Sequence, residues 1–262
     1  MKTFTICIPC VDKHIEKVYK LLESLEHHII KPNKVIISLS PKYLKLDLNQ
    51  EKKRLEEKFP FLLCLVQNKI TGAGENLNHT FKYVETDYAV IWGADDFFHP
   101  QYLEIISHVV DKYNPNILCH LWDDELTKLT KKNPNLAYNF DVFKKINLNE
   151  VITITDINIE TKHHPDDGRG NTVPRFYYKQ YYYKPGLYHK TLHSVSKFMA
   201  NLHYGMQIFK TNIIKENKYL IGPDYDYRSD TLFLTDMYKK YGNMRVICAH
   251  LIQYVPEKTY SG

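Results

Sequence analysis

The stretch YAVIWGADDFFHP, from Tyr88 to Pro100, joins an apolar segment to two adjacent aspartates, Asp95 and Asp96. The apolar part has the length and composition of a buried β-strand. Two carboxylates side by side at the end of such a strand repel each other, and removing either from water is costly unless a cation balances it. Either both aspartates face solvent at a turn and cap the next helix, or a cation binds there.

The segments around this stretch alternate between strand-like and helix-like patterns. The expected strands lie at 4–9, 34–40, 61–68, 88–93 and 116–122, and the expected helices at 12–28, 49–59, 71–84 and 100–113. Asp12 is the expected N-cap of the first helix, and Pro100 is expected in the first turn of the fourth. The alternation predicts an α/β fold with a mostly parallel sheet and helices on both faces, with about the first 120 residues forming one Rossmann-like unit.

The second half of the chain has a different pattern. A half-exposed strand is expected at 151–160, a helix at 191–202, and a helix at 229–241 that ends at Gly242 and leads into a strand at 244–250. The turn-rich segment from Lys162 to Pro174 is expected to be a loop that is mobile without ligand and ordered with it. A basic, tyrosine-rich stretch at 171–220 is either a solvated face or a surface for a diphosphate or an anionic acceptor.

The composition bounds the class of protein. The chain has 262 residues, 44% of them hydrophobic, and a formal net charge of +5, which is typical of a globular protein and low for a nucleic-acid binder. Its five cysteines are odd in number and sit mostly in apolar runs, so we expect buried free thiols in a reducing compartment. No apolar run is long enough to span a bilayer or to form a signal peptide, and we expect a cytoplasmic protein.

The position of the acidic pair predicts a metal site. Ligands of open α/β sheets bind beyond the carboxyl ends of the strands, which is where Asp95 and Asp96 fall. Mg²⁺ and Mn²⁺ take a few carboxylate oxygens from the protein and complete their coordination with water and substrate phosphates. The pair therefore suits a clamp for a metal and a diphosphate.

The order of these features resembles the nucleotide-sugar glycosyltransferases with the GT-A fold, family 2 type. The resemblance rests on CIPCVD at 7–12 and on KITGAGENLNHTFKYVETDYAVIWGADDFFHPQYLEII at 69–106, with a weaker echo over 204–250. It implies a GT-A fold, with residues 1–125 as the nucleotide-sugar (donor) binding half. Residues 126–262 would then be the acceptor-side half of the same domain, as a C-terminal extension.

The resemblance also implies roles for individual residues. The implied donor contacts are Pro9, Cys10, Asp12, Ser38, Asn76 and Asp95; the implied metal ligands are Asp95, Asp96 and His250; and the implied catalytic residues are Asp230 and Asp226, with Asp224 close by. Asp230 is the first choice for the base, because it matches the family's Asp at the start of a late helix. The other reading of Asp230 is a helix N-cap.

Two positions depart from the family pattern. Gly93 stands where the family has the first Asp of its Asp-x-Asp metal motif, and Ser38 and Ser40 end a strand at which many relatives carry an Asp near the base. The metal could therefore use another ligand, the base contact could be remade, or activity could be lost.

The expected function is transfer of a sugar from a nucleotide diphosphate sugar to a hydroxyl of a glycan or glycoconjugate, with inversion and with Mn²⁺ or Mg²⁺. A non-catalytic nucleotide- or sugar-binding relative is one alternative. A nucleotidyltransferase is another, although the glycine- and basic-rich loop such enzymes carry after the first strand is absent from IPCVDKHIEK at 8–17. Nucleic acid is not an expected partner, and the sugar, the base, the acceptor and the oligomeric state stay open.

Overall fold

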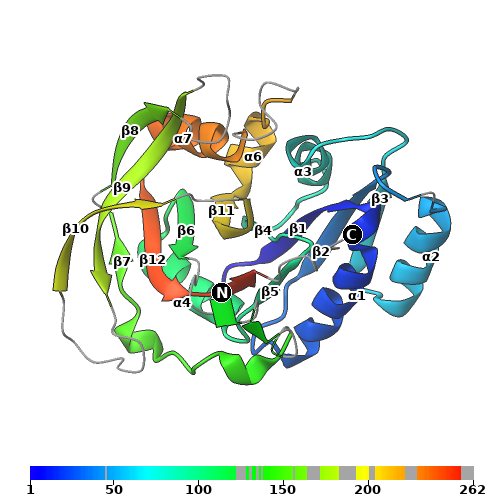
Figure 1. Cartoon of the computed structure of the whole chain (residues 1–262), viewed down its shortest axis with the longest axis horizontal. Helices are drawn as coiled ribbons and strands as arrows, with labels where there is room; N and C mark the ends of the chain where they lie inside the picture. Colours follow the sequence, from blue (N-terminus) through cyan, green and yellow to red (C-terminus); the bar gives the residue numbers. More distant parts are fainter. Residues whose placement is uncertain are drawn as a thin grey trace.

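The computed structural model describes most of the chain, drawn in colour in Figure 1. The described residues are 1–44, 46–121, 128–129, 132–133, 136, 138–155, 157–163, 172–182, 193–200, 204–221 and 229–254. At positions 121, 158–163, 172–182, 193–200, 204, 250 and 254 the description is of the backbone path.

An eight-stranded sheet forms the centre of the molecule, in the order β3-β2-β1-β4-β11-β6-β12-β7. Its strands are β1 (Phe4–Val11), β2 (Lys34–Ser40), β3 (Leu62–Val66), β4 (Tyr88–Ile91), β6 (Ile117–Leu121), β7 (Thr153–Ile154), β11 (Gln207–Lys210) and β12 (Met244–His250). Strands β3, β2, β1 and β4 are mutually parallel, and β12 is parallel to β6. Strand β11 runs antiparallel to both β4 and β6, between which it lies, so the predicted mostly parallel α/β sheet is confirmed.

Helices cover both faces of this sheet. They are α1 (Ile15–Ser24), α2 (Leu48–Lys58), α3 (Ala73–Phe81), α4 (Tyr102–Tyr113), α6 (Thr211–Glu216) and α7 (Ser229–Tyr241). Successive residues of a strand point to opposite faces. Accordingly Ile6 and Ile8 of β1 pack in a core with α1, α2 and α4, whereas Cys7 packs in a second core with α3, α6 and α7. Figure 1 shows α3, α6 and α7 together along one side.

Two smaller sheets complete the described structure. Strands β8 (Ile157–His163), β9 (Thr172–Tyr182) and β10 (His193–Ala200) form an antiparallel arm at the left of Figure 1. Strand β5 (Asp96–Phe98) pairs antiparallel with β13 (Ile252–Tyr254). This second pairing joins the acidic motif to a segment more than 150 residues later in the chain.

The arm corrects two predictions. The helix expected at 191–202 is wrong, because His193–Ala200 is a strand with a register irregularity between Val195 and Phe198, paired with β9. The loop expected from Lys162 to Pro174 is wrong at its ends, because Lys162 pairs with Val173 and Thr161 with Pro174 across β8 and β9. The middle of that loop, 164–171, lies outside the described residues.

Two predicted helix starts are also displaced. Asp12 begins the short 3-10 helix η1 (Asp12–His14) and does not cap α1, whose N-cap is His14. Pro100 precedes the N-cap Gln101 of α4 and is not in its first turn. A turn in which the Tyr102 amide donates to the His99 carbonyl comes before that helix.

Two other expectations are confirmed, the end of α7 at Gly242 and the buried cysteines. Gly242 follows α7 with φ of 58°, the left-handed conformation that favours glycine at a helix end, and its amide donates to the Tyr238 carbonyl. All five cysteines are buried free thiols. In the part of the chain that the structure describes, the helices are too short or too polar to cross a bilayer.

Candidate active site

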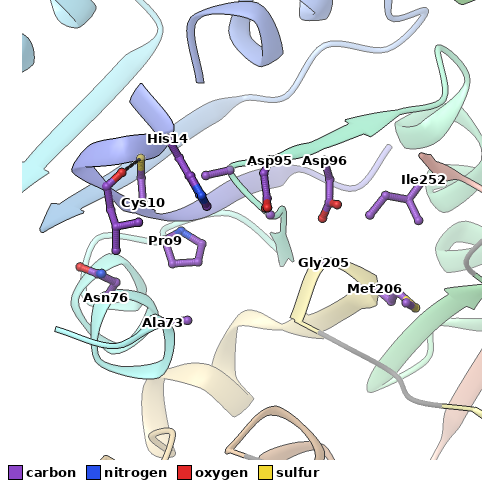
Figure 2. A pocket seen from close by; sticks show the side chains of 13 residues that line it. Pro9, Cys10, His14, Ala73, Asn76, Asp95, Asp96, Gly205, Met206 and Ile252 are labelled. Carbon is purple, nitrogen blue, oxygen red and sulfur yellow. Dashed lines mark hydrogen bonds between the residues drawn. The ribbon is translucent and has the colours of Figure 1, made fainter. Parts of the chain in front are cut away.

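A cavity of about 430 Å³ lies beyond the carboxyl ends of β1 and β4 (Figure 2). Its lining comes from the end of β1, from η1, from the start of α3, from the turn after β4, from the 3-10 helix η6 (Tyr204–Met206) and from β13. The lining residues are Pro9, Cys10, Val11, His14, Ala73, Asn76, Gly93, Ala94, Asp95, Asp96, Gly205, Met206 and Ile252. The place matches the rule that open α/β sheets bind ligands at this edge.

Asp95 and Asp96 lie just past the end of β4 and are half-buried in this lining. Burial raises the pKa of the Asp96 carboxyl well above its usual range, the charge of Asp95 raises it further, and Lys17 opposes both. The physical cause is that a second negative charge is unfavourable in a partly desolvated cavity. A cation bound between the two carboxylates would remove that repulsion.

The donor chemistry of this pair fits Mg²⁺ or Mn²⁺. Both ions prefer carboxylate oxygens and keep several positions for water and substrate phosphates. Within the described residues, no group of three or more His, Cys, Asp or Glu side chains is placed to hold a metal ion. In the described part of the chain, Asp95 and Asp96 would therefore supply two protein ligands to the metal ion.

Asp12 differs from its predicted role in donor binding. Its side chain is 1% exposed and does not line the cavity. Its carboxylate accepts hydrogen bonds from the amides of Lys42 (3.0 Å), Tyr43 (2.9 Å) and Leu44 (2.7 Å). Burial by itself would raise the pKa of Asp12, but these backbone donors outweigh it and lower the pKa. Asp12 thus fixes the loop after β2 beside the end of β1.

Asn76 and Ser38 belong to one buried hydrogen-bond network. Asn76 lines the cavity, its Oδ1 accepts from Ser38 Oγ (2.8 Å), and its Nδ2 donates to Ser40 Oγ (3.0 Å). Ser38 is fully buried and lies behind Asn76 rather than in the cavity lining. The two serines at the end of β2 therefore orient the Asn76 amide.

One residue of the cavity lining, His14, and one residue near the acidic motif, Tyr138, were missed by the sequence reasoning. His14 is half-buried and points into the cavity (Figure 2). Tyr138 has a left-handed backbone (φ 61°), and its buried hydroxyl has no hydrogen-bond partner in the described structure. Burial first, and then the charges of Asp95 and Asp96, raise the pKa of Tyr138. Its ring lies 5.5 Å from that of Phe97, the residue after Asp96, and it is not in the cavity lining. No local sequence pattern marks either residue, since the tertiary fold decides where each of them lies.

The remaining predicted residues are only partly described. Asp230 lies in the first turn of α7, is 8% exposed, and its Oδ1 accepts from the Thr231 amide (2.6 Å); it is not in the cavity lining. Asp224 and Asp226 lie outside the described residues. His250 is the last residue of β12, where the description is of the backbone.

Three solved structures share this fold at low identity. TarS 1-349 from S. aureus in complex with UDP-GlcNAc matches with a TM-score of 0.54 and 12% identity over 96% of this chain and 58% of that one. The mannosyltransferase PcManGT from Pyrobaculum calidifontis in complex with GDP-Man and Mn²⁺ matches with a TM-score of 0.56 and 12% identity over 99% and 59%. Glucosyl-3-phosphoglycerate synthase from Mycobacterium tuberculosis, in complex with Mn²⁺, UDP and phosphoglyceric acid, matches with a TM-score of 0.50 and 10% identity over 94% and 67%.

The chain spans less than two thirds of the TarS and PcManGT chains that it matches. A comparison with curated protein sequences gave no match. The family described as Glycosyl transferase family 2 matches residues 5–181, which include the ends of β1 and β4 and the acidic pair. The chain therefore belongs to glycosyl transferase family 2 and has the GT-A fold of its structural neighbours.

Proposed function

We propose that this protein transfers a sugar from a nucleotide diphosphate sugar to a hydroxyl of a glycan or glycoconjugate, with the help of Mn²⁺ or Mg²⁺. The observation that carries the proposal is the pair of carboxylates, Asp95 and Asp96, in a cavity of about 430 Å³ at the carboxyl ends of β1 and β4. Structures of the same fold contain UDP-GlcNAc in TarS and GDP-Man with Mn²⁺ in PcManGT, which supports this class of donor.

The acidic pair would hold the cation, and the cation would neutralise the diphosphate as it leaves the sugar. The end of β1, with Pro9 and Cys10, and the oriented amide of Asn76 form the opposite side of the cavity, and we assign them to the nucleoside part of the donor. His14 is polar and lines the same cavity, and we assign it to the diphosphate or the sugar.

The acceptor hydroxyl must lose a proton as it attacks, and a positioned carboxylate is the usual base in an inverting transfer. Asp230 is our first choice for that base, with Asp226 as the second. Asp230 lies in the first turn of α7, and its carboxylate accepts hydrogen bonds from the amide and the hydroxyl of Thr231. His250 is our proposal for an additional metal ligand.

The metal clamp predicts the behaviour of Asp95→Asn. This variant should weaken Mn²⁺-dependent binding of UDP or GDP by about 1.5–3 kcal/mol, because a charged contact is lost. Titration calorimetry with and without Mn²⁺ measures the effect, and Asp111→Asn on the exposed face of α4 is the matched control. Unchanged, metal-independent affinity in Asp95→Asn would remove the clamp from the proposal.

The base assignment predicts that Asp230→Asn lowers turnover by roughly 10²- to 10⁴-fold with donor affinity nearly unchanged. If the residue only stabilises the start of α7, the variant should instead lose about 1 kcal/mol of stability and keep its rate. Turnover, donor affinity and melting temperature, measured on the same preparation, separate the two roles. Near-normal turnover would transfer the role to Asp226 or Asp224, or to a retaining mechanism without such a base.

Sugar transfer and its alternatives would release different products from a nucleotide sugar. Incubation with a panel of nucleotide sugars, with and without Mn²⁺, should release a nucleoside diphosphate from one donor. Binding of a donor without turnover would favour a non-catalytic relative, and release of a nucleoside monophosphate would point away from sugar transfer.

A further inference from the structure

Two glycines from distant parts of the chain approach the Asp96 carboxylate. A Cβ atom at Gly93 would lie 2.2 Å from Asp96 Oδ2 and 2.9 Å from its Cγ. A Cβ atom at Gly205 would lie 2.9 Å from the same Oδ2. Contacts under 3.0 Å are essentially never made by real Cβ atoms, so any other residue at either position would displace this carboxylate.

The remaining contact at Gly93 is much looser, whereas the remaining contacts at Gly205 are also tight. Apart from Asp96, the nearest atom to a Cβ at position 93 would be Asp95 Oδ1 at 3.5 Å, an ordinary van der Waals distance. At position 205 the next atoms are the Gly93 amide nitrogen and Ile252 Cδ1, each at 3.3 Å. Gly93 therefore lacks a side chain chiefly to make room for the carboxylate of Asp96.

The backbone of Asp96 is fixed from the opposite direction. Asp96 starts β5, and it pairs with Tyr254 of β13. Ile252 of the same strand lines the cavity next to Asp96 (Figure 2). With its backbone held in this ladder, Asp96 directs its carboxylate into the space beside the two glycines.

We propose that Gly93 and Gly205 are positioning residues that form a slot for the Asp96 carboxylate and hold it in the cavity beside Asp95. In this arrangement Asp96 occupies the volume that a side chain at position 93 would fill. Gly93 is then required for the placement of Asp96 in the acidic pair. Its missing side chain does not mean that the site has lost a metal ligand. The use of the carboxylate for a metal rests on the proposed function, whereas the slot itself does not.

A double-mutant cycle tests the slot without any metal. Gly93→Ala should lower the melting temperature of the otherwise unchanged protein by several degrees. In the Asp96→Ala background, where the first remaining neighbour is 3.5 Å away, the same change should have almost no effect. An equal fall in melting temperature in both backgrounds would overturn the proposal. If Gly93→Ala alone fails to fold, recovery of folding in the double variant is the expected result.

Mn²⁺ binding tests the consequence for the site. In titrations with Mn²⁺ alone, followed by electron paramagnetic resonance of the free ion, Gly93→Ala and Gly205→Ala should bind at least tenfold more weakly than the unchanged protein. Gly93→Asp, which adds a third carboxylate, should also bind more weakly, because it expels that of Asp96. Stronger binding by Gly93→Asp would overturn the proposal.

Gly242→Ala is the matched control. Gly242 has a positive φ of 58° and no atom within 4 Å of its would-be Cβ, so this variant should lose stability and keep its Mn²⁺ affinity. Failure of the unchanged protein to bind Mn²⁺, combined with coupling in the stability cycle, would refute the metal part of the proposed function and leave the slot intact. Mn²⁺ binding that is insensitive to Gly93→Ala would refute the slot and leave the function.

Discussion

His28 is a buried imidazole beside the rings of Trp92 and Phe140, at centroid distances of 5.5 Å and 6.4 Å. The side chain is 3% exposed, and neither ring nitrogen has a hydrogen-bond partner in the described structure. Burial, helped by the nearby cations, lowers the pKa of His28 to about 3. Because the unfolded chain has an ordinary histidine pKa near 6.5, unfolding takes up a proton at any pH between these values.

This shift predicts a loss of stability in acid. Above pH about 6.5, the shifted pKa of His28 does not reduce the free energy of unfolding. As the pH falls from 6.5 to 5, proton uptake by the unfolded state lowers that free energy by about 1.5 kcal/mol. His28→Leu cannot be protonated, so its free energy of unfolding should fall less over this interval. Urea unfolding at the two pH values measures the difference. His27→Leu, at the exposed neighbouring position, should keep the full acid loss, and an identical loss in His28→Leu would contradict the assignment.

The acidic pair could be predicted from the sequence because its signal is local. An apolar strand ends within a few residues of Asp95 and Asp96, which places them at the edge where open α/β sheets bind ligands. Asp12 could not be assigned in this way, because the amides it accepts from lie about 30 residues away in a loop without a sequence signature. For the same reason the pairing of Asn76 with Ser38 was visible only in the structure.

At the scale of elements, the short strand β13 stabilises the acidic motif. The His99 amide donates to the Leu251 carbonyl at 3.0 Å, next to the β5–β13 ladder. Hydrogen-bonded pairs alternate in antiparallel ladders, so the next such pair is Gln253 with Phe97. Phe97 directly follows Asp96, and this ladder therefore controls the backbone from which that carboxylate extends.

Gln253→Pro should break the ladder at this point, because proline has no amide to donate. We expect a loss of about 1–3 kcal/mol of stability and faster hydrogen exchange at Phe97 and His99, together with weaker Mn²⁺ binding. Gln253→Ala keeps the backbone amide and removes the side chain, which donates to the Leu136 carbonyl, so it should affect exchange at Phe97 much less. Equal effects of the two variants would assign the stabilisation to the side chain.

The sequence predicted well those elements whose burial follows from their own spacing of apolar residues. Helix α1 buries Ile15, Val18, Leu21 and Leu22 on one face, and Leu25 just after the helix continues that face, at the spacing seen in the sequence. Residues 191–202 carry a helical spacing too, but 193–200 pair as β10 with β9 and not as a helix. The long-range pairing of the arm outweighs the local pattern there, and a single sequence does not reveal its partner.

At the scale of the whole molecule, the donor-side and acceptor-side halves that we propose share one sheet. Strand β11, from the second half, lies between β4 and β6 of the first half and pairs with both. Helices α6 and α7 cover the face that Cys7, Ala89 and Ile117 line. Neighbouring strands of the sheet therefore alternate more than once between the two halves, residues 1–125 and 126–262.

We predict that residues 1–125 alone do not fold to a cooperative unit. Without β11, strands β4 and β6 have no partner between them, and their edges and one apolar face are exposed to water. The fragment should aggregate or bind a hydrophobic dye, and it should lack a sharp thermal transition. Production together with residues 126–262 should restore a soluble complex, because the missing strand and helices are supplied in trans. A cooperative transition of the fragment alone would mean that the donor side is an independent domain, and that the central strand only joins a sheet already formed.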